Sequence, residues 1–267
     1  MPPKPVIVVV PGAFHKPSDY AGIITPLQYQ GYPVLCVSLA VCGDARDDVS
    51  PEATPTNDAK ALHAQLLPLL DAGHEAIIVA HSYGSMVATA SIQGQTKAER
   101  SVRGLAGGVV GAIWMAGFAF PAKGRNISGG EEEAAPMSYH RLKDGLISLT
   151  EAAKPLFYSD VPSQAADAAW ASLCKFQSFK SLNTFPQFLE SEIAIPKLYL
   201  LCVRDQTVPS AFQETMTQVG KFDKVLRLES GHSPFFSVPG KVVEAIAEFS
   251  GEVSGRQDAP LPYSDTK

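Results

Sequence analysis

Six short apolar runs, separated by longer helix-like segments, constrain the fold of this chain more than any other feature. They occupy residues 6–10, 33–40, 75–82, 111–118, 196–203 and 224–230. The runs are almost continuously apolar instead of alternating with polar residues, which indicates strands that are buried on both faces. Such strands belong to a parallel sheet with helices on both sides, so we expect an α/β fold with a mostly parallel sheet of about six strands.

The segments between these runs carry helical patterns. Residues 20–30, 56–71, 210–219 and 240–249 fit amphipathic helices. In the second of these, leucines at 62, 66, 69 and 70 recur at helical spacing, although Pro68 must bend or shorten the helix. The alternation of strand and helix predicts a single large domain, a size that the 267 residues allow.

Residues 121–195 interrupt this rhythm. Apolar residues at 142, 146, 149, 170, 173 and 176 predict helices there. A helical insertion between two parallel strands is placed to cover the carboxyl edge of the sheet, where such folds bind ligands; the alternative is that it only extends the core. We therefore expect a core of residues 1–120 and 196–254, a helical cap of residues 121–195, and a flexible Pro-rich tail of residues 255–267.

Charge and composition exclude some partners. The net charge is −5 and no run of Lys or Arg occurs, so we expect no nucleic-acid partner. The apolar run Val6–Val10 is too short for a signal peptide or a membrane span, and no later apolar run reaches 18 residues, so we expect no membrane partner. Four cysteines form no C-x-x-C pair, and Cys36 and Cys202 lie in apolar runs where buried free thiols are typical, which favours a cytoplasmic location.

The pentapeptide AHSYG, residues 80–84, joins a predicted strand to a predicted helix. A small-x-Ser-x-Gly sequence in this context is typical of a nucleophile elbow, a sharp turn that needs small residues on either side of the serine. Ala80 and Gly84 meet this need. Ser82 is therefore a candidate nucleophile, while the alternative is an ordinary serine at the end of a strand.

Two later loops supply the partners that such a serine needs. Asp205 lies in CVRDQTVP after the fifth apolar run, and His232 lies in LESGHSPFFSVP after the sixth. The chain order Ser, Asp, His matches the order expected for this kind of triad. Because the carboxyl ends of parallel strands share one edge of the sheet, we expect Ser82, Asp205 and His232 to meet there.

An oxyanion hole would complete the site. The first strand ends in VVVPGAFH, and Gly12 permits close backbone approach. We expect one N–H donor from Ala13, with Phe14 as the alternate, and a second from Tyr83 at the start of the helix after Ser82.

Five pieces of the chain, PGAFH, AHSYGSM, MAGFAFP, LYLLCVRDQTVP and SGHSPFFSVP, resemble the α/β-hydrolase superfamily and, within it, the small plant-type methylesterase and hydroxynitrile lyase group. The resemblance implies triad roles for Ser82, Asp205 and His232, and oxyanion roles for the N–H groups of Ala13 and Tyr83. The family motif usually has His where this chain has Pro11, a departure that concerns the surroundings of the oxyanion loop.

Two positions distinguish the branches of that group. The lyase branch typically has Thr at the place of Gly12 and Lys directly after the histidine, where this chain has Ser233. Both favour a serine hydrolase that cleaves an ester or lactone of a small apolar molecule through an acyl-enzyme. The alternatives are a cofactor-free C–C lyase, decarboxylase or cyclase with His232 as base, and a ligand receptor with little turnover.

The pocket is predicted from weaker signals. Gly12, His15, Phe118, Phe120 and Trp170 fall near strand ends or in the cap and suggest an apolar pocket for a small molecule. The histidines outside the predicted triad show no ligand spacing, so we expect neither metal nor organic cofactor. The sequence leaves the oligomeric state, including a homodimer, open.

Overall fold

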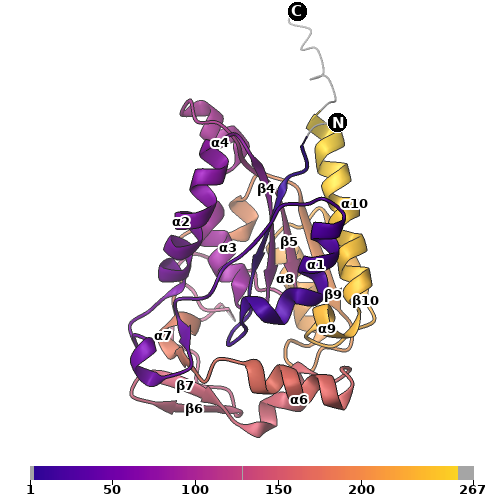
Figure 1. Ribbon diagram of the computed structural model, residues 1–267. Coiled ribbons are helices and arrows are strands. Elements are labelled where there is room, and N and C mark those ends of the chain that lie inside the picture. Colours follow the sequence, from indigo (N-terminus) through magenta and orange to yellow (C-terminus); the bar gives the residue numbers. More distant parts are fainter. Residues whose placement is uncertain (1–2, 128, 258–267) are drawn as a thin grey trace, which may run out of the picture.

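The computed structural model of the protein describes residues 3–127 and 129–257. Its centre is a parallel sheet (Figure 1) whose strands lie in the order β10-β9-β5-β4-β1-β2. The six strands are β1 (Val6–Val10), β2 (Val34–Cys36), β4 (Glu75–His81), β5 (Gly108–Met115), β9 (Lys197–Cys202) and β10 (Lys224–Leu228). All five neighbouring pairs are parallel, so the predicted six-stranded parallel sheet is confirmed.

One face of the sheet is covered by α2 (Pro55–Asp71), α3 (Gly84–Ile92) and α8 (Ser210–Val219). Alternate residues of a strand point to opposite faces, and Val6, Val8 and Val10 point to this one. They pack with the helical stripe of α2, whose buried leucines lie at 62, 66 and 70. Pro68 sits in the last turns of α2, and the helix nevertheless continues to Asp71.

The other face is covered by α1 (Ala21–Tyr29) and α10 (Pro239–Gln257), which run side by side in Figure 1. Ile7 and Val9 pack against them. The helix α10 is longer than its pattern predicts. It includes the first residues of the expected tail, and the rest of that tail, residues 258–267, lies outside the described residues.

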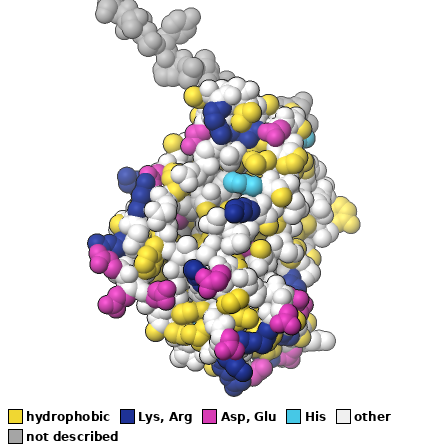
Figure 2. Space-filling model, turned by 90° about the vertical axis from the view of Figure 1, so that its left-hand side faces the viewer, with side chains coloured by type: hydrophobic (Ala, Val, Ile, Leu, Met, Phe, Trp, Pro, Cys, Tyr) yellow, Lys and Arg dark blue, Asp and Glu magenta, His cyan; other side chains and the backbone are white. Residues whose placement is uncertain are grey.

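In the described residues, two short helices and two 3-10 turns complete the core, and two further 3-10 turns lie between residues 121 and 195. They are α4 (Lys97–Val102), α9 (Pro234–Ser237) and the turns Pro17–Tyr20, Arg46–Asp48, Glu151–Ala153 and Glu190–Glu192. Among the described residues, no helix is long and apolar enough to cross a membrane. Acidic and basic side chains are interspersed over the face in Figure 2, in keeping with the absence of Lys and Arg runs in the sequence.

The four cysteines are all free thiols. Cys202 is buried, as its apolar run predicts. Cys36 is only half-buried, because β2 is the edge strand of the sheet and has a neighbour on one side alone.

The segment from 121 to 195, which we call the cap, lies across one end of the sheet, at the bottom of Figure 1. In its described residues it combines three helices with three strands, and these strands join β3 of the core segment in a second sheet with the order β3-β8-β7-β6. The elements are β3 (Cys42–Gly43), β6 (His140–Lys143), β7 (Leu146–Leu149), β8 (Phe176–Ser178), α5 (Lys154–Phe157), α6 (Ser163–Ser172) and α7 (Phe179–Leu182).

The helix expected around Leu142, Leu146 and Leu149 is a β-hairpin instead, and that part of the prediction is wrong. β6 and β7 pair antiparallel, with Lys143 opposite Leu146. The two residues between them, Asp144 and Gly145, have φ of 52° and 73°. An Asp-Gly pair in this left-handed conformation is the preferred two-residue turn of a hairpin, so its local chemistry overrides the helical spacing of the leucines.

The cap is tied to the core beside the loop after β10. The carboxylate oxygen Oδ2 of Asp160 accepts the backbone N–H of Gly231 at 2.7 Å. A side chain at 231 would approach Asp160 Oδ1 to 2.6 Å and Ser159 Oγ to 2.5 Å. A residue with a Cβ at 231 would therefore require the side chains of Ser159 and Asp160 to move, since the cap lies directly against this position.

The start of α3 lies against the end of β1 with no room for a side chain. A Cβ on Gly84 would lie 2.4 Å from the carbonyl oxygen of Val10 and 2.5 Å from that of Pro11. We expect Gly84→Ala to lower the free energy of unfolding by about 1–3 kcal/mol or more, because backbone must move to accept the methyl group. Denaturant unfolding followed by circular dichroism measures this.

The matched control is Gly251→Ala, at an exposed site of α10 where a Cβ would meet nothing within 4 Å. Alanine is the better helix former there, so this variant should be neutral or more stable by up to about 1 kcal/mol. Equal unfolding free energies for the two variants would contradict the close packing of α3 on β1.

Candidate active site

Ser82 sits in a strained turn between β4 and α3. Its φ is 48°, in the left-handed region that residues with a side chain rarely adopt. The backbone N–H of Ser82 donates to the Met115 carbonyl at 3.0 Å, and Ser85 Oγ donates to the Ser82 carbonyl at 2.7 Å. Ala80 is fully buried in β4, opposite Val10 and Trp114. The neighbouring strands thus hold the serine in a conformation that it would not adopt alone.

His232 and Asp205 form a buried pair. Nδ1–H of His232 donates to Asp205 Oδ2 at 2.8 Å. The other carboxylate oxygen accepts the N–H groups of Thr207 at 2.7 Å and Val208 at 2.8 Å, and Gln213 donates to Oδ2 at 3.1 Å. These donors fix the carboxylate, which in turn assigns the proton of the imidazole to Nδ1 and leaves Nε2 as an acceptor.

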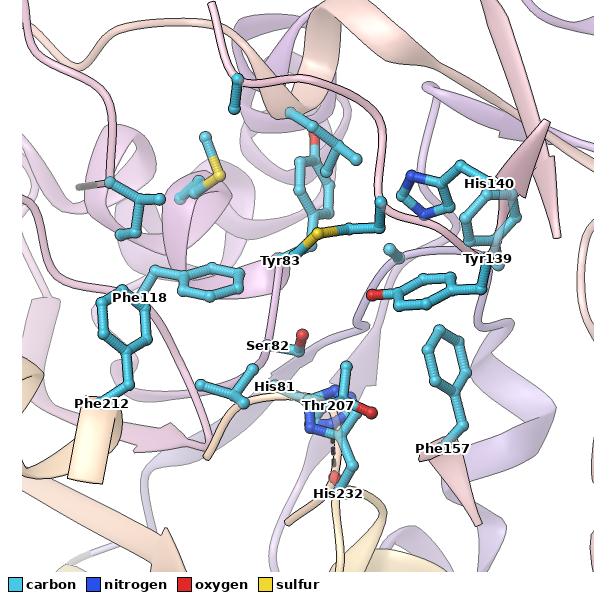
Figure 3. A pocket seen from close by; sticks show the side chains of 18 of the residues that line it. His81, Ser82, Tyr83, Phe118, Tyr139, His140, Phe157, Thr207, Phe212 and His232 are labelled. Atoms are coloured by element: carbon cyan, nitrogen blue, oxygen red, sulfur yellow. Dashed lines mark hydrogen bonds between the residues drawn. The ribbon is translucent and has the colours of Figure 1, made fainter. Parts of the chain in front are cut away.

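Ser82 and His232 both line the same cavity. The Ser82 hydroxyl makes no hydrogen bond to any residue in the described ranges, and Figure 3 shows it directed into the cavity. Rotation about the Cα–Cβ bond of Ser82 redirects this hydroxyl. A nucleophile and base that bond only when substrate is present are common in empty sites.

The loop after β1 offers one backbone donor to this cavity. Within the described part of the chain, the N–H groups of Ala13 and Tyr83 have no acceptor, and both residues line the cavity. The alternate donor, Phe14, is ruled out. Its N–H donates to Gln177 Oε1 at 3.0 Å, because Phe14 adopts a φ of 63° that turns it toward β8 of the cap.

A buried chain of hydrogen bonds passes through His81. The N–H of Gly12 donates to the Tyr20 hydroxyl at 2.8 Å, and that hydroxyl donates to His81 Nδ1 at 2.8 Å. His81 Nε2–H then donates to the carbonyl of His232 at 2.9 Å. Burial holds the pKa of His81 well below its usual value, so the ring is neutral and each nitrogen has one defined role.

His15 is hydrogen-bonded through both of its ring nitrogens. Its Nδ1–H donates to the Ala13 carbonyl at 2.9 Å, and its Nε2 accepts from the Tyr158 hydroxyl at 3.2 Å. Its ring stacks on Phe157 with centroids 6.0 Å apart. Burial lowers the pKa of His15 to about 4, so it is neutral near pH 7. The ring therefore supports the loop that carries Ala13.

The cavity has a volume of about 300 Å³ and lies between the core and the cap. Among the described residues, no Lys, Arg, Asp or Glu lines it. Most of its wall is apolar, and the larger apolar side chains are those of Phe14, Met86, Phe118, Phe120, Ile127, Met137, Phe157, Phe179, Leu182, Val208 and Phe212. Such a cavity suits a small, neutral organic molecule.

Three of the five residues predicted for the pocket, His15, Phe118 and Phe120, line the cavity. Gly12 does not line the cavity. It packs against His81 instead, and a Cβ on Gly12 would lie 2.5 Å from His81 Nδ1. Trp170 does not either. It sits on α6 and its Nε1–H donates to Glu151 Oε1 at 3.1 Å. Ser233 is fully buried and also outside the cavity.

Several residues that line the cavity are not among those predicted for the pocket from the sequence. Tyr139 and His140 lie in the cap at the start of the unrecognised hairpin, and Phe157 lies on α5. Thr207 follows Asp205 by only two residues, so its position in the same loop could have predicted that it lies near the site. In the described residues, no three His, Cys, Asp or Glu side chains are grouped so that they could hold a metal ion.

Comparison with known proteins gives a consistent result. The sequence pattern of the Alpha/beta hydrolase family matches residues 7–245. An α/β hydrolase of Aspergillus novofumigatus is 31% identical over 255 residues, which cover 93% of this chain and 98% of that protein. A probable hydrolase of a Phoma species is 25% identical over 262 residues and covers 93% of this chain and 99% of its own.

Solved structures share the fold. A pyrethroid hydrolase from Sphingobium faniae superposes with a TM-score of 0.70 at 19% identity, covering 92% of this chain and 97% of that one. A methylesterase from Arabidopsis superposes with a TM-score of 0.68 at 19% identity, covering 93% and 99%.

The buried hydrogen bonds through His81 predict that removing the Tyr20 hydroxyl lowers the free energy of unfolding. Tyr20→Phe would leave two buried groups, the Gly12 N–H and His81 Nδ1, without partners. Each such loss costs about 1–3 kcal/mol, so we expect a clear fall in unfolding free energy. Tyr29→Phe is the control, because Tyr29 is 89% exposed. If urea unfolding gives the same stability for both variants, the buried chain is not structural.

The neutral state of His15 predicts a dependence of stability on pH. Its pKa is about 4 in the folded protein and near 6.5 when unfolded, so between these values only the unfolded chain takes up the proton. The contribution of His15 to the free energy of unfolding is at its maximum above pH 6.5. It falls as the pH drops toward 4, by about 3 kcal/mol in all.

We therefore expect His15→Gln to flatten part of the decline in unfolding free energy between pH 6.5 and 4, measured by urea unfolding at several pH values. His74→Gln reports the effect of replacing an exposed imidazole in the same way. A decline in His15→Gln as steep as in the wild type would contradict the assigned neutral state.

Proposed function

The chain belongs to the α/β-hydrolase family and is an enzyme of that family; from this premise we propose that it is a serine hydrolase that cleaves an ester or lactone bond of a small apolar molecule. One observation carries the proposal. His232 is bonded to Asp205 through Nδ1 at 2.8 Å and lines one cavity with Ser82, the residue held in the left-handed turn.

In the proposed mechanism, His232 Nε2 takes the proton of the Ser82 hydroxyl while the serine oxygen attacks the carbonyl carbon. The negative charge that forms on the carbonyl oxygen is stabilised by the N–H groups of Ala13 and Tyr83. Collapse of the tetrahedral intermediate expels the alcohol, which receives the proton from His232. Water, deprotonated by His232, then releases the acid from Ser82. Asp205 keeps the imidazole in the tautomer that both halves need.

The substrate class follows from the wall of the cavity. Because no charged side chain lines it among the described residues, a charged substrate would lose its hydration without a compensating partner. A volume of about 300 Å³ fits a small molecule and excludes a polymer. The names of the pyrethroid hydrolase and the methylesterase, which share the fold, support ester chemistry for this chain.

The structure also gives a physical reason for the absence of a larger residue at position 12. A threonine there, typical of the lyase branch, would collide with His81 Nδ1 unless the buried hydrogen-bond chain moved. Gly12 and Ser233, which differ from the residues typical of the lyase branch, support hydrolysis over base-only chemistry by His232. The four free thiols support the cytoplasmic location that forms part of the same proposal.

Ser82→Ala tests the nucleophile. We expect it to abolish labelling by a fluorophosphonate probe and to lower kcat/KM on the best ester or lactone of a panel by roughly 10⁴-fold or more. The control is Ser101→Ala, at an exposed serine, which should label and turn over like the wild type. Labelling is read on a gel and hydrolysis by the release of acid.

Two outcomes would favour the rival functions. Activity on a true substrate that survives Ser82→Ala but is lost in His232→Ala indicates a lyase, decarboxylase or cyclase in which the histidine alone acts as base. A wild-type protein that binds small molecules but neither labels nor cleaves any ester or lactone indicates a receptor.

A further inference from the structure

The two walls of the cavity differ in chemistry. In Figure 3, Phe118 and Phe212 stand on one side of Ser82, whereas Tyr139, His140 and Phe157 stand on the other. The side chains of Phe118 and Phe212 are hydrocarbon and offer no hydrogen bond. The second carries a phenol and an imidazole, both from the beginning of the hairpin in the cap. A substrate that lies across Ser82 therefore meets an apolar wall at one end and polar groups at the other.

The hydroxyl of Tyr139 is directed into the cavity (Figure 3) and makes no hydrogen bond to any residue in the described ranges. The ring is held by edge contacts to His140, with centroids 4.7 Å apart, and to Phe157, at 6.0 Å. Burial raises the pKa of Tyr139 to about 12, so the phenol keeps its proton. A fixed ring thus presents a neutral hydroxyl that can donate or accept.

His140 supplies the second polar group. Its Nδ1 has no hydrogen-bond partner in the described part of the chain and is closed to solvent, so the ring must turn before a ligand oxygen in the cavity can reach this atom. Its backbone N–H is bonded to the Met137 carbonyl at 2.8 Å, which fixes the residue at the start of β6. Buried polar atoms without a partner are rare in proteins, because the lost hydration is not replaced. Burial also lowers the pKa of His140 to about 4, so the ring is neutral.

Apart from Ser82 itself and groups beside it, the other polar side chains around the cavity have partners. Both nitrogens of His15 and of His81 are bonded, and Asn183 accepts the Ala134 N–H at 2.8 Å. The hydroxyl of Thr207 is also unpartnered, but it lies beside His232 at the reacting centre (Figure 3). Tyr139 and His140 are thus the unpartnered polar side chains on the wall away from His232.

We propose that Tyr139 and His140 form a subsite that binds a neutral hydrogen-bonding oxygen of the substrate, a hydroxyl or a carbonyl, away from the bond that Ser82 attacks. The inference deepens the proposed function and rests on it for the identity of the ligand as a substrate. The bound group is neutral, since both partners are neutral and no charged side chain lines the cavity among the described residues. The apolar end of the same molecule lies against Phe118 and Phe212.

Matched pairs of esters that differ by one hydroxyl test the subsite. The pairs are phenyl acetate with resorcinol monoacetate, and methyl phenylacetate with methyl para-hydroxyphenylacetate, which place the hydroxyl on the alcohol and on the acyl side. We expect the wild type to prefer the hydroxylated member of at least one pair by about tenfold in kcat/KM, the effect of one satisfied hydrogen bond in an apolar site. Tyr139→Phe and His140→Phe should each reduce this ratio.

Phe118→Leu is the control from the opposite wall. It should change kcat/KM for both members of a pair alike and leave their ratio at the wild-type value. Because each ratio compares two substrates in one protein, a lower fraction of folded enzyme cancels. A wild-type ratio near one in both pairs, or an unchanged ratio in both Tyr139→Phe and His140→Phe, overturns the subsite.

Binding of ketones separates the subsite from the proposed function, because ketones occupy the cavity without being hydrolysed. Calorimetry compares acetophenone with para-hydroxyacetophenone. Tighter binding of the hydroxylated ketone that is lost in Tyr139→Phe, in a protein that neither labels nor cleaves esters, supports the subsite and refutes the hydrolase. Ester cleavage that depends on Ser82 but shows no hydroxyl preference in cleavage or binding supports the hydrolase and refutes the subsite.

Discussion

The hydrogen-bond chain through His81 connects three loops on which the candidate site depends. Gly12 comes from the end of β1, His81 from the end of β4, and His232 from the loop after β10, while Tyr20 closes the gap between the first two. Every member is buried, where an unpaired donor or acceptor is costly. The loop after β1, the turn at Ser82 and the loop after β10 are thus held to one another through one shared side chain, in addition to the pairing of their strands.

Much of this architecture is predictable because burial on both faces leaves a plain trace in sequence. The run Val6–Val10 is short, β-branched and continuously apolar, which favours a central strand, and the other apolar runs favour strands in the same way. The order of the strands in the sheet cannot be predicted from these apolar runs. The edge position of β2, which leaves Cys36 half-buried, depends on long-range packing that no local pattern records.

Two causes explain the site residues whose surroundings differ from those expected. The N–H of Phe14 donates to Gln177, a partner 163 positions away that no local motif reveals, and so it is not free for a substrate. Tyr139 and His140 were hidden because leucine spacing suggested a helix, although the Asp144-Gly145 turn identifies a hairpin. By contrast, Ser82, Asp205 and His232 each follow a recognisable strand, so topology alone brings them to one edge. Their catalytic roles remain a proposal that labelling will test.

The bond between Asp160 and the N–H of Gly231 has a consequence for how this enzyme can diversify. The cap contacts the residue directly before His232, so its sequence is not free to drift independently of the core. A cap transplanted from a relative would have to bring a small acceptor at the place of Asp160 and meet a glycine at 231. Selection for new substrates is therefore expected to act on cavity residues such as Tyr139 while this junction stays unaltered.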